Sequence, residues 1–172
     1  MSVIPTTALV PTTRRGGARL ITNLCVWHAT AGDSLRSSLE WVARPESTSG
    51  FHLGIDRDGT VQLSTPLSFV AWHAGQSAWP VPASGVPTHA SVNSRSIGIE
   101  FANRNDGVER ITPAQITSAI ALAKELGARY PALARTTSHV RHRDISPGRK
   151  TDPHPMALDW PAFLALIAKG FL

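Results

Sequence analysis

The spacing of apolar and polar positions changes several times along the chain, which predicts a mixture of strands and helices. Apolar and β-branched residues dominate 21–27 and predict a first strand. Apolar residues at helical spacing follow, with Asp33 or Ser34 as the N-cap and Pro45 as the stop. The first part of the chain is therefore predicted to be one strand and one amphipathic helix.

A β-hairpin is predicted next. Residues 51–56 and 60–63 flank the pair Asp58-Gly59, which supplies the positive φ that a tight turn needs. Residues 69–72 predict a further short strand. Prolines and small polar residues fill 76–94, so we expect a long loop there, and such loops in compact domains are usually functional or mobile.

Residues 96–102 alternate between apolar and other side chains, which is typical of a strand with one buried face. Ile97, Ile99 and Phe101 point to one side of such a strand. Glu100 points to the opposite side, away from the core that the other three should fill.

The second long helix has the clearest signals. Thr112 can cap it, and Pro113 occupies its first turn, where a proline is well tolerated. The expected apolar stripe consists of Ile116, Ile120 and Ala123, flanked by Leu122 and Leu126.

The last part of the chain adds a short strand near 136–140 and a final helix from Asp159 through Ala168. Strands and helices thus interleave and include a hairpin. This order predicts an α/β fold, a single domain with a central mixed β-sheet flanked by helices. We expect residues 1–18 to form an extended lead-in and residues 19–172 to form the domain.

Composition narrows the class of protein. Hydrophobic residues make up 42% and charged residues 17% of the 172 residues, an ordinary globular balance. Cys25 is the only cysteine, which excludes a scaffold held by internal disulfides. The net charge of +5 would attract nucleic acid, anionic membranes or the acidic bacterial envelope, or it only aids solubility. The basic residues are scattered without interleaved aromatics, so we expect no nucleic-acid partner.

No apolar run approaches the length of a transmembrane helix. The N-terminal stretch also lacks the order of a signal peptide, because Arg14 and Arg15 come after its apolar residues. We therefore expect synthesis in the cytoplasm without a signal peptide. We also expect a monomer without stable membrane insertion.

Three residues far apart in the sequence carry groups that bind zinc. His28 ends the first predicted strand, and His142 and Asp152 bound a segment in which Pro147-Gly148 can fold the chain back. Two imidazoles and one carboxylate leave a catalytic zinc ion a position for water and a net positive charge. A histidine taken alone is more often a hydrogen-bonded core residue, so spacing leaves both interpretations open.

Six sequence blocks occur in a fixed order: VWHAT at 26–30, FH at 51–52, DRDG at 56–59, AWHAG at 71–75, NSRSIGIE at 93–100 and HRDISPGRKTDP at 142–153. In these blocks the chain resembles the type 2 N-acetylmuramoyl-L-alanine amidases. That family includes phage endolysins, cytoplasmic muropeptide-recycling amidases and peptidoglycan recognition proteins. The resemblance implies the fold of that family, with bacterial peptidoglycan or muropeptides as the partner.

The resemblance implies that His28, His142 and Asp152 are zinc ligands, with Zn²⁺ as the cofactor. Recognition members that have lost catalysis commonly lack the third ligand, so Asp152 indicates an active zinc amidohydrolase. Glu100 is the candidate general base, which takes a proton from water and returns one to the leaving amine. An exposed strand carboxylate is the alternative for this residue.

Lys150 lies two residues before Asp152, so in an extended segment both side chains point the same way. Family members use the matching lysine to stabilise the oxyanion, which makes Lys150 a second catalytic candidate, with a solvated surface lysine as the alternative. His139 should face away from the site and is treated as structural. The candidate substrate contacts are His52, Trp72, His73, Ala74 and Gly75.

We expect a zinc-dependent amidase that hydrolyses the bond between N-acetylmuramic acid and L-alanine. The compact, basic chain favours a phage-type endolysin that reaches the cell wall by holin-type release. One alternative is a cytoplasmic recycling amidase acting on soluble anhydro-muropeptides, which would share every catalytic residue. The other is a non-catalytic peptidoglycan-binding module.

Overall fold

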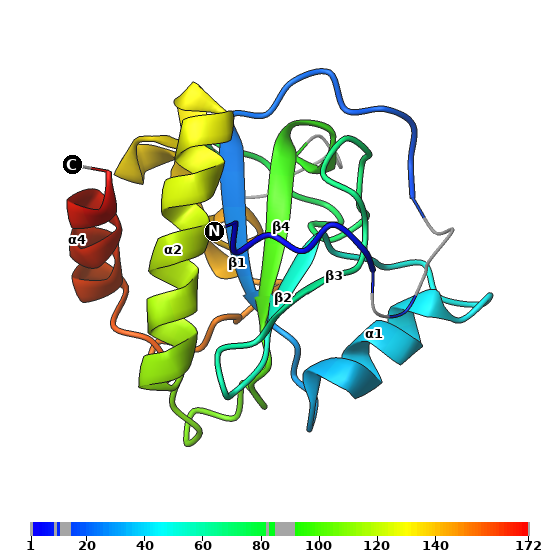
Figure 1. Cartoon of the computed structure of the whole chain (residues 1–172), viewed down its shortest axis with the longest axis horizontal. Helices are drawn as coiled ribbons and strands as arrows, with labels where there is room; N and C mark the ends of the chain where they lie inside the picture. Colours follow the sequence, from blue (N-terminus) through cyan, green and yellow to red (C-terminus); the bar gives the residue numbers. More distant parts are fainter. Residues whose placement is uncertain (1, 9, 11–14, 82, 85–91, 172) are drawn as a thin grey trace.

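The computed structural model describes residues 2–8, 10, 15–81, 83–84 and 92–171. Its strands are β1 (Leu24–Ala29), β2 (Leu53–Ile55), β3 (Val61–Leu63), β4 (Ser96–Phe101) and β5 (His139–Arg141). They form one five-stranded sheet in the order β3-β2-β4-β1-β5 (Figure 1). The β2–β4, β4–β1 and β1–β5 pairs are parallel, and the β2–β3 hairpin is antiparallel. The predicted mixed sheet is confirmed.

The helices lie on both faces of the sheet, as a parallel sheet requires. In the described residues they are α1 (Leu35–Ala43), α2 (Pro113–Arg129), α3 (His142–Ile145) and α4 (Trp160–Gly170), with 3₁₀ turns at Asn93–Arg95, Pro131–Leu133 and Thr136–Ser138. The predicted caps are confirmed, because the side chains of Ser34, Thr112 and Asp159 accept backbone N–H groups at the starts of α1, α2 and α4.

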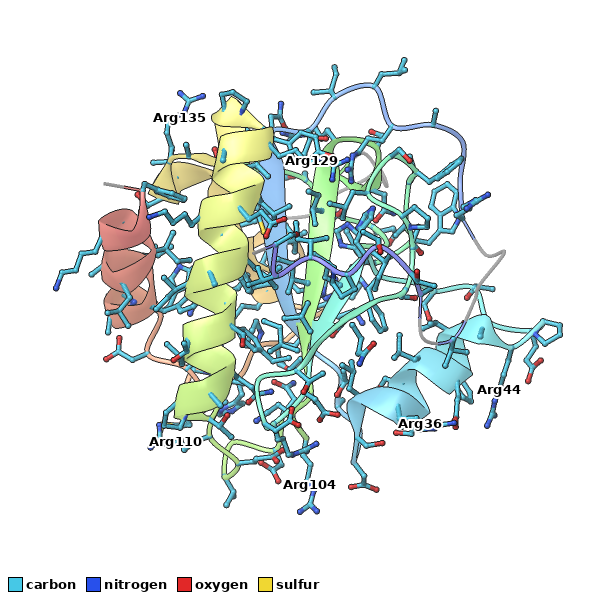
Figure 2. The ribbon with its side chains drawn as sticks, viewed as in Figure 1. Arg36, Arg44, Arg104, Arg110, Arg129 and Arg135 are labelled. Carbon is cyan, nitrogen blue, oxygen red and sulfur yellow. The ribbon has the colours of Figure 1, made fainter. Side chains whose placement is uncertain are left out.

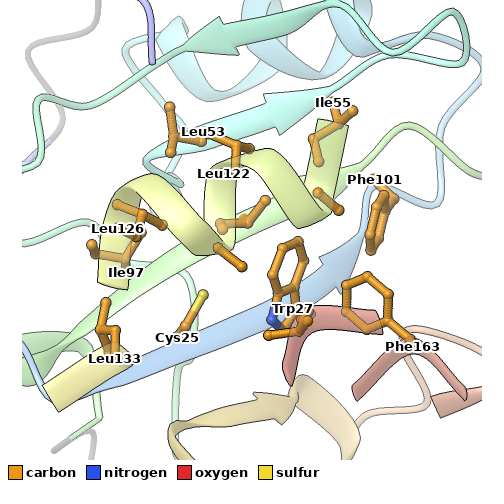
Figure 3. Close-up of a cluster of buried hydrophobic side chains, with 14 of the residues drawn as sticks. Cys25, Trp27, Leu53, Ile55, Ile97, Phe101, Leu122, Leu126, Leu133 and Phe163 are labelled. Atoms are coloured by element: carbon orange, nitrogen blue, oxygen red, sulfur yellow. The ribbon is translucent and has the colours of Figure 1, made fainter. Parts of the chain in front are cut away.

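The face of the sheet under α2 and α4, called the apolar face below, carries the larger core (Figures 1 and 3). Trp27 of β1 stacks on Phe101 of β4, with ring centroids 5.4 Å apart. Phe163 of α4 meets the Trp27 ring edge-on at 5.0 Å. Leu122 and Leu126 of α2 are fully buried in the same cluster.

The opposite face is called the imidazole face below. Glycines in its strands leave room for side chains to pack close to the backbone. A Cβ on Gly54 would lie 2.2 Å from Cδ1 of Leu35, and a Cβ on Gly98 would lie 2.4 Å from Cγ of His73. The missing side chains therefore let α1 and His73 rest directly on β2 and β4.

The strand predicted at 69–72 is wrong. Among the described residues, Phe69 forms an isolated bridge to Ala18 and belongs to no strand of the sheet. The N–H of Gly16 donates to the carbonyl of Val70 at 2.8 Å, so this segment pairs with the N-terminal lead-in and not with the sheet.

The predicted stripe of α2 is rotated from the observed one. Leu122, Ala123 and Leu126 of the prediction are completely buried, but Ile116 and Ile120 are only partly buried, and Ala119, which the prediction left out, is completely buried. Small residues such as Ala119 face the sheet because they allow the helix to approach it closely, a choice that apolar spacing does not reveal.

The chain around the last strand also differs in detail. β5 begins only at His139, because a 3₁₀ turn occupies Thr136–Ser138, and the single turn of α3 follows at His142 without a preceding loop. His139 lies on the apolar face as expected, where its Nδ1 is 3.2 Å from the indole nitrogen of Trp27.

Residues 82 and 85–91 of the loop expected at 76–94 lie outside the described residues, so its mobility stays a prediction. Within the described part of the chain, no helix is both long and apolar enough to cross a membrane. The labelled arginines are spread around the molecule and do not gather in one patch: Arg36, Arg44, Arg104, Arg110, Arg129 and Arg135 (Figure 2).

Candidate metal centre

The three candidate metal ligands meet at one end of the sheet, on the imidazole face. Nδ1 of His28 lies 2.9 Å from Nδ1 of His142. Oδ2 of Asp152 lies 3.1 Å from Nδ1 of His142 and 3.4 Å from Nδ1 of His28. The three atoms form a nearly equilateral triangle, called the ligand triangle below, and all three residues are buried.

The sheet topology explains this convergence. His28 is near the carboxyl end of β1, and His142 directly follows β5, the parallel neighbour of β1. After α3 the chain turns back through Gly148, which has a φ of +74°. The N–H of Arg143 then donates to the carbonyl of Asp152 at 3.0 Å, which holds this residue beside the two histidines.

The ligand triangle fits a divalent metal ion. Tetrahedral ligands about 2.0–2.1 Å from a zinc ion lie roughly 3.3 Å from one another, close to the separations found here. The other ring nitrogens already have partners: Nε2 of His28 is 3.0 Å from Nδ1 of His73, and Nε2 of His142 is 3.2 Å from the carbonyl of Ala74. Both Nδ1 atoms are thus left for a metal, as is usual for metal-binding histidines.

Burial sets the charges in the triangle. It lowers the pKa of His28 to about 4, so this imidazole is neutral at pH 7, the form that binds metals. Burial opposes ionisation of Asp152, but its contacts with His142 and His28 outweigh burial and hold the pKa of the carboxyl below its ordinary value. The site therefore offers a carboxylate to a cation.

Glu100 stands beside the ligand triangle near the end of β4. It is the register partner of His28, and its Oε1 lies 4.0 Å from Nδ1 of that residue. Its Oε2 is buried without a hydrogen-bond partner among the described residues. Burial and then the charge of Asp152 raise the pKa of Glu100 well above its ordinary value, while Lys150 lowers it. A carboxyl in this position can both accept and return a proton.

A cavity of about 770 Å³ opens over the triangle. Glu100 and Lys150 line it next to the metal group. At its other end it runs along α1, where Trp41 and Arg44 line it and the guanidinium carbon lies 5.0 Å from the indole centroid. The sequence predicts α1 as an amphipathic helix and assigns no site residue to it, although Trp41 falls outside its apolar face and is 54% exposed.

The five predicted substrate contacts lie in different surroundings. His73 lines the cavity and is 8% exposed, whereas His52 is completely buried. Nδ1 of His52 accepts the N–H of Gly98 at 3.0 Å. Trp72 is 45% exposed, and Ala74 is buried. Gly75 has a φ of +56° and packs against the guanidinium group of Arg149. Substrate contact by these residues stays a prediction.

Asn93 is a further residue of the site that the sequence analysis did not single out. Its Oδ1 accepts the N–H groups of His73 at 3.1 Å and Ala74 at 2.8 Å. These are the two residues whose acceptors face the ring nitrogens of His28 and His142. No spacing rule identifies such a contact, since Asn93 lies about twenty residues away from its partners in the sequence.

Known proteins are similar to this chain in sequence and in fold. The chain is 39% identical over 119 residues to the 1,6-anhydro-N-acetylmuramyl-L-alanine amidase AmpD of Salmonella typhimurium, a match covering 68% of this chain. It spans 56% of that relative's length. A crystal structure of a selenomethionine AmpD derivative superposes with a TM-score of 0.74 and 27% identity, covering 96% of this chain and 97% of the other. A mutant endolysin from Bacillus subtilis, with a TM-score of 0.65, covers 95% of this chain and 94% of its own, but at 22% identity it shows a common fold alone.

The match to a protein family covers most of the chain. The family model described as N-acetylmuramoyl-L-alanine amidase matches residues 18–155. This range includes every element from β1 to β5 and all three residues of the ligand triangle. The chain belongs to the N-acetylmuramoyl-L-alanine amidase family.

Proposed function

We propose that the protein is a zinc-dependent amidase that hydrolyses the bond between N-acetylmuramic acid and L-alanine in soluble anhydro-muropeptides. The observation that carries the proposal is the ligand triangle with Glu100 beside it in an open cavity. From the sequence we expect a phage-type endolysin. The 39% identity to a protein named for a 1,6-anhydro substrate supports the recycling alternative instead, because the endolysin likeness extends only to the fold.

His28, His142 and Asp152 would hold the zinc ion. When bound, zinc polarises the scissile carbonyl and makes water more acidic. Glu100 accepts a proton from the attacking water as its oxygen bonds to the carbonyl carbon. Glu100 then gives the proton to the alanine nitrogen as the carbon–nitrogen bond breaks, which leaves a muramyl carboxyl group and a free amine.

Lys150 supports two parts of this reaction. It lines the same cavity, so its ammonium group can stabilise negative charge on the carbonyl oxygen. Its charge also lowers the pKa of Glu100 and so favours the ionised base.

Mass spectrometry of two digests tests the proposal. The zinc-loaded protein is incubated with a purified anhydro-muropeptide and, separately, with intact sacculi. We expect free stem peptide from the soluble substrate at the higher rate, and no release after treatment with EDTA. Faster cleavage of sacculi would favour the endolysin instead. Zinc binding without cleavage of either substrate would contradict the proposal and favour a binding module.

A further inference from the structure

His73 is buried on the imidazole face with a partner on each ring nitrogen. Its Nδ1 lies 3.0 Å from Nε2 of His28, and its Nε2 lies 3.0 Å from Oγ of Ser96. The two imidazole rings of His28 and His73 meet edge to face, with an interplanar angle of 86°. His73 therefore contacts the back of a metal ligand, on the side away from the ligand triangle.

Ser96 fixes the direction of these hydrogen bonds. The hydroxyl of Ser96 donates its only proton to the carbonyl of Val92 at 2.6 Å. Oγ of Ser96 must then accept from Nε2–H of His73. A neutral imidazole with its proton on Nε2 has a free lone pair on Nδ1, so Nδ1 of His73 is an acceptor for Nε2–H of His28.

We propose that His73 is a positioning residue for the metal: it fixes the tautomer and ring plane in which Nδ1 of His28 faces the ion. The inference rests on the metal site of the proposed function and deepens it. It gives His73 a task other than substrate contact, since both of its ring nitrogens are engaged inside the protein.

The surrounding residues hold His73 in this place. Gly98 leaves the space for its ring, because a Cβ there would lie 2.4 Å from Cγ and 2.8 Å from Nδ1 of His73. Asn93 fixes the backbone by accepting the N–H groups of His73 and Ala74. The carbonyl of Ala74 faces Nε2 of His142. Two consecutive residues thus supply acceptors to both histidines of the triangle.

The test is the zinc dissociation constant, measured by competition with a chelator of known affinity. His73→Leu removes the acceptor and keeps a side chain of similar bulk, and we expect the dissociation constant to rise roughly 10- to 100-fold. His73→Asn can place its Oδ1 where Nδ1 stood, so we expect it to stay within about threefold of the parent. The visible absorption spectrum of the cobalt-substituted protein should change in His73→Leu and persist in His73→Asn.

His139→Leu is the matched control, because it removes a buried imidazole that takes a ring N–H on the apolar face. We expect its zinc affinity to be unchanged. Equal affinities of His73→Leu and the parent, or equal weakening in His73→Leu and His73→Asn, would overturn the inference. If His73→Leu does not fold, Ser96→Ala decides: weaker zinc binding supports the inference, and parental affinity overturns it. A parent protein that binds no zinc would instead refute the metal site itself.

Discussion

On the apolar face of the sheet, Trp27, Phe101 and Phe163 pack ring against ring, with centroids 5.0–6.1 Å apart. On the imidazole face of the same strands, His28 and Glu100 stand next to one another within a group of titratable side chains. The apolar contacts are non-directional, and many residues share them. The polar contacts are directional, and each nitrogen or oxygen has an assigned partner.

The difference between the two faces shows how the fold tolerates reactive groups that are unfavourable for stability. Glu100 has an unpartnered buried oxygen and a raised pKa, which are unfavourable for folding. The packing of α2 and α4 on the opposite face stabilises the sheet without touching these groups. We therefore expect substitutions on the imidazole face to change metal binding and turnover, and those on the apolar face to change stability.

Asp152→Ala should have the largest effect on function. It removes the only carboxylate of the ligand triangle and leaves two imidazoles, too few protein ligands for a catalytic zinc site. We expect zinc to be lost during gel filtration, as measured by elemental analysis, and turnover to become undetectable. Asp144→Ala is the matched control, since Asp144 lies in the same segment but pairs with Arg141. Full zinc occupancy in Asp152→Ala would exclude Asp152 as a ligand.

Glu100→Gln should separate catalysis from metal binding. We expect zinc content to be retained and kcat to fall roughly 10²- to 10⁴-fold, the usual contribution of a general acid–base group. The metal-free variant should also resist urea at least as well as the parent, because the amide carries no charge where Oε2 is buried without a partner. Turnover near the parental rate would rule out Glu100 as the base.

Phe163→Ala tests the other side of the comparison. Phe163 is 1% exposed and contacts Trp27 and Phe101, so its removal leaves a cavity in the largest core cluster. We expect a loss of about 3–5 kcal/mol in the free energy of unfolding. Zinc affinity of the folded fraction should stay at the parental value. A large loss of zinc affinity without a loss of stability would contradict the division between the two faces.

Much of this division could be predicted from the sequence. Alternation in β4 placed Glu100 opposite Ile97 and Phe101, and the structure has that arrangement. The Asp-Gly turn and the helix caps are local features, so the hairpin and the starts of α1 and α2 also followed from residue type. The residues of the triangle followed from the resemblance to a known family, because their spacing alone left open whether His28 and His142 were core histidines.

The supporting contacts could not be predicted, because they depend on tertiary distance. Asn93 and Ser96 reach His73 across about twenty residues, and neither belongs to a recognisable metal-binding pattern. The role of Gly98 depends on which ring lies above it. The face of α2 that meets the sheet likewise depends on close packing at Ala119. Apolar spacing instead predicts that Ile116 lies on this face.

One pH measurement compares the two faces directly, because each carries a buried histidine outside the ligand triangle. Burial, followed by the charge of Arg19, lowers the pKa of His52 to about 3, and burial also lowers the pKa of His139. The unfolded chain takes up these protons below its ordinary pKa of about 6.5, and the folded chain resists doing so. Stability is therefore complete above that pH and falls with acidification, by about 1.4 kcal/mol per pH unit for His52 and in the same direction for His139.

We expect urea unfolding in EDTA to show a loss of stability between about pH 6 and pH 4. His52→Gln should reduce the slope by about one proton, and His139→Gln should reduce it in the same direction. A reduced slope in both variants would show that burial keeps histidines on both faces unprotonated, although only one face holds the candidate metal site. A parental slope in His52→Gln would mean that His52 is already protonated in the folded protein. Its Nδ1 could then no longer accept the N–H of Gly98, the residue that leaves room for His73.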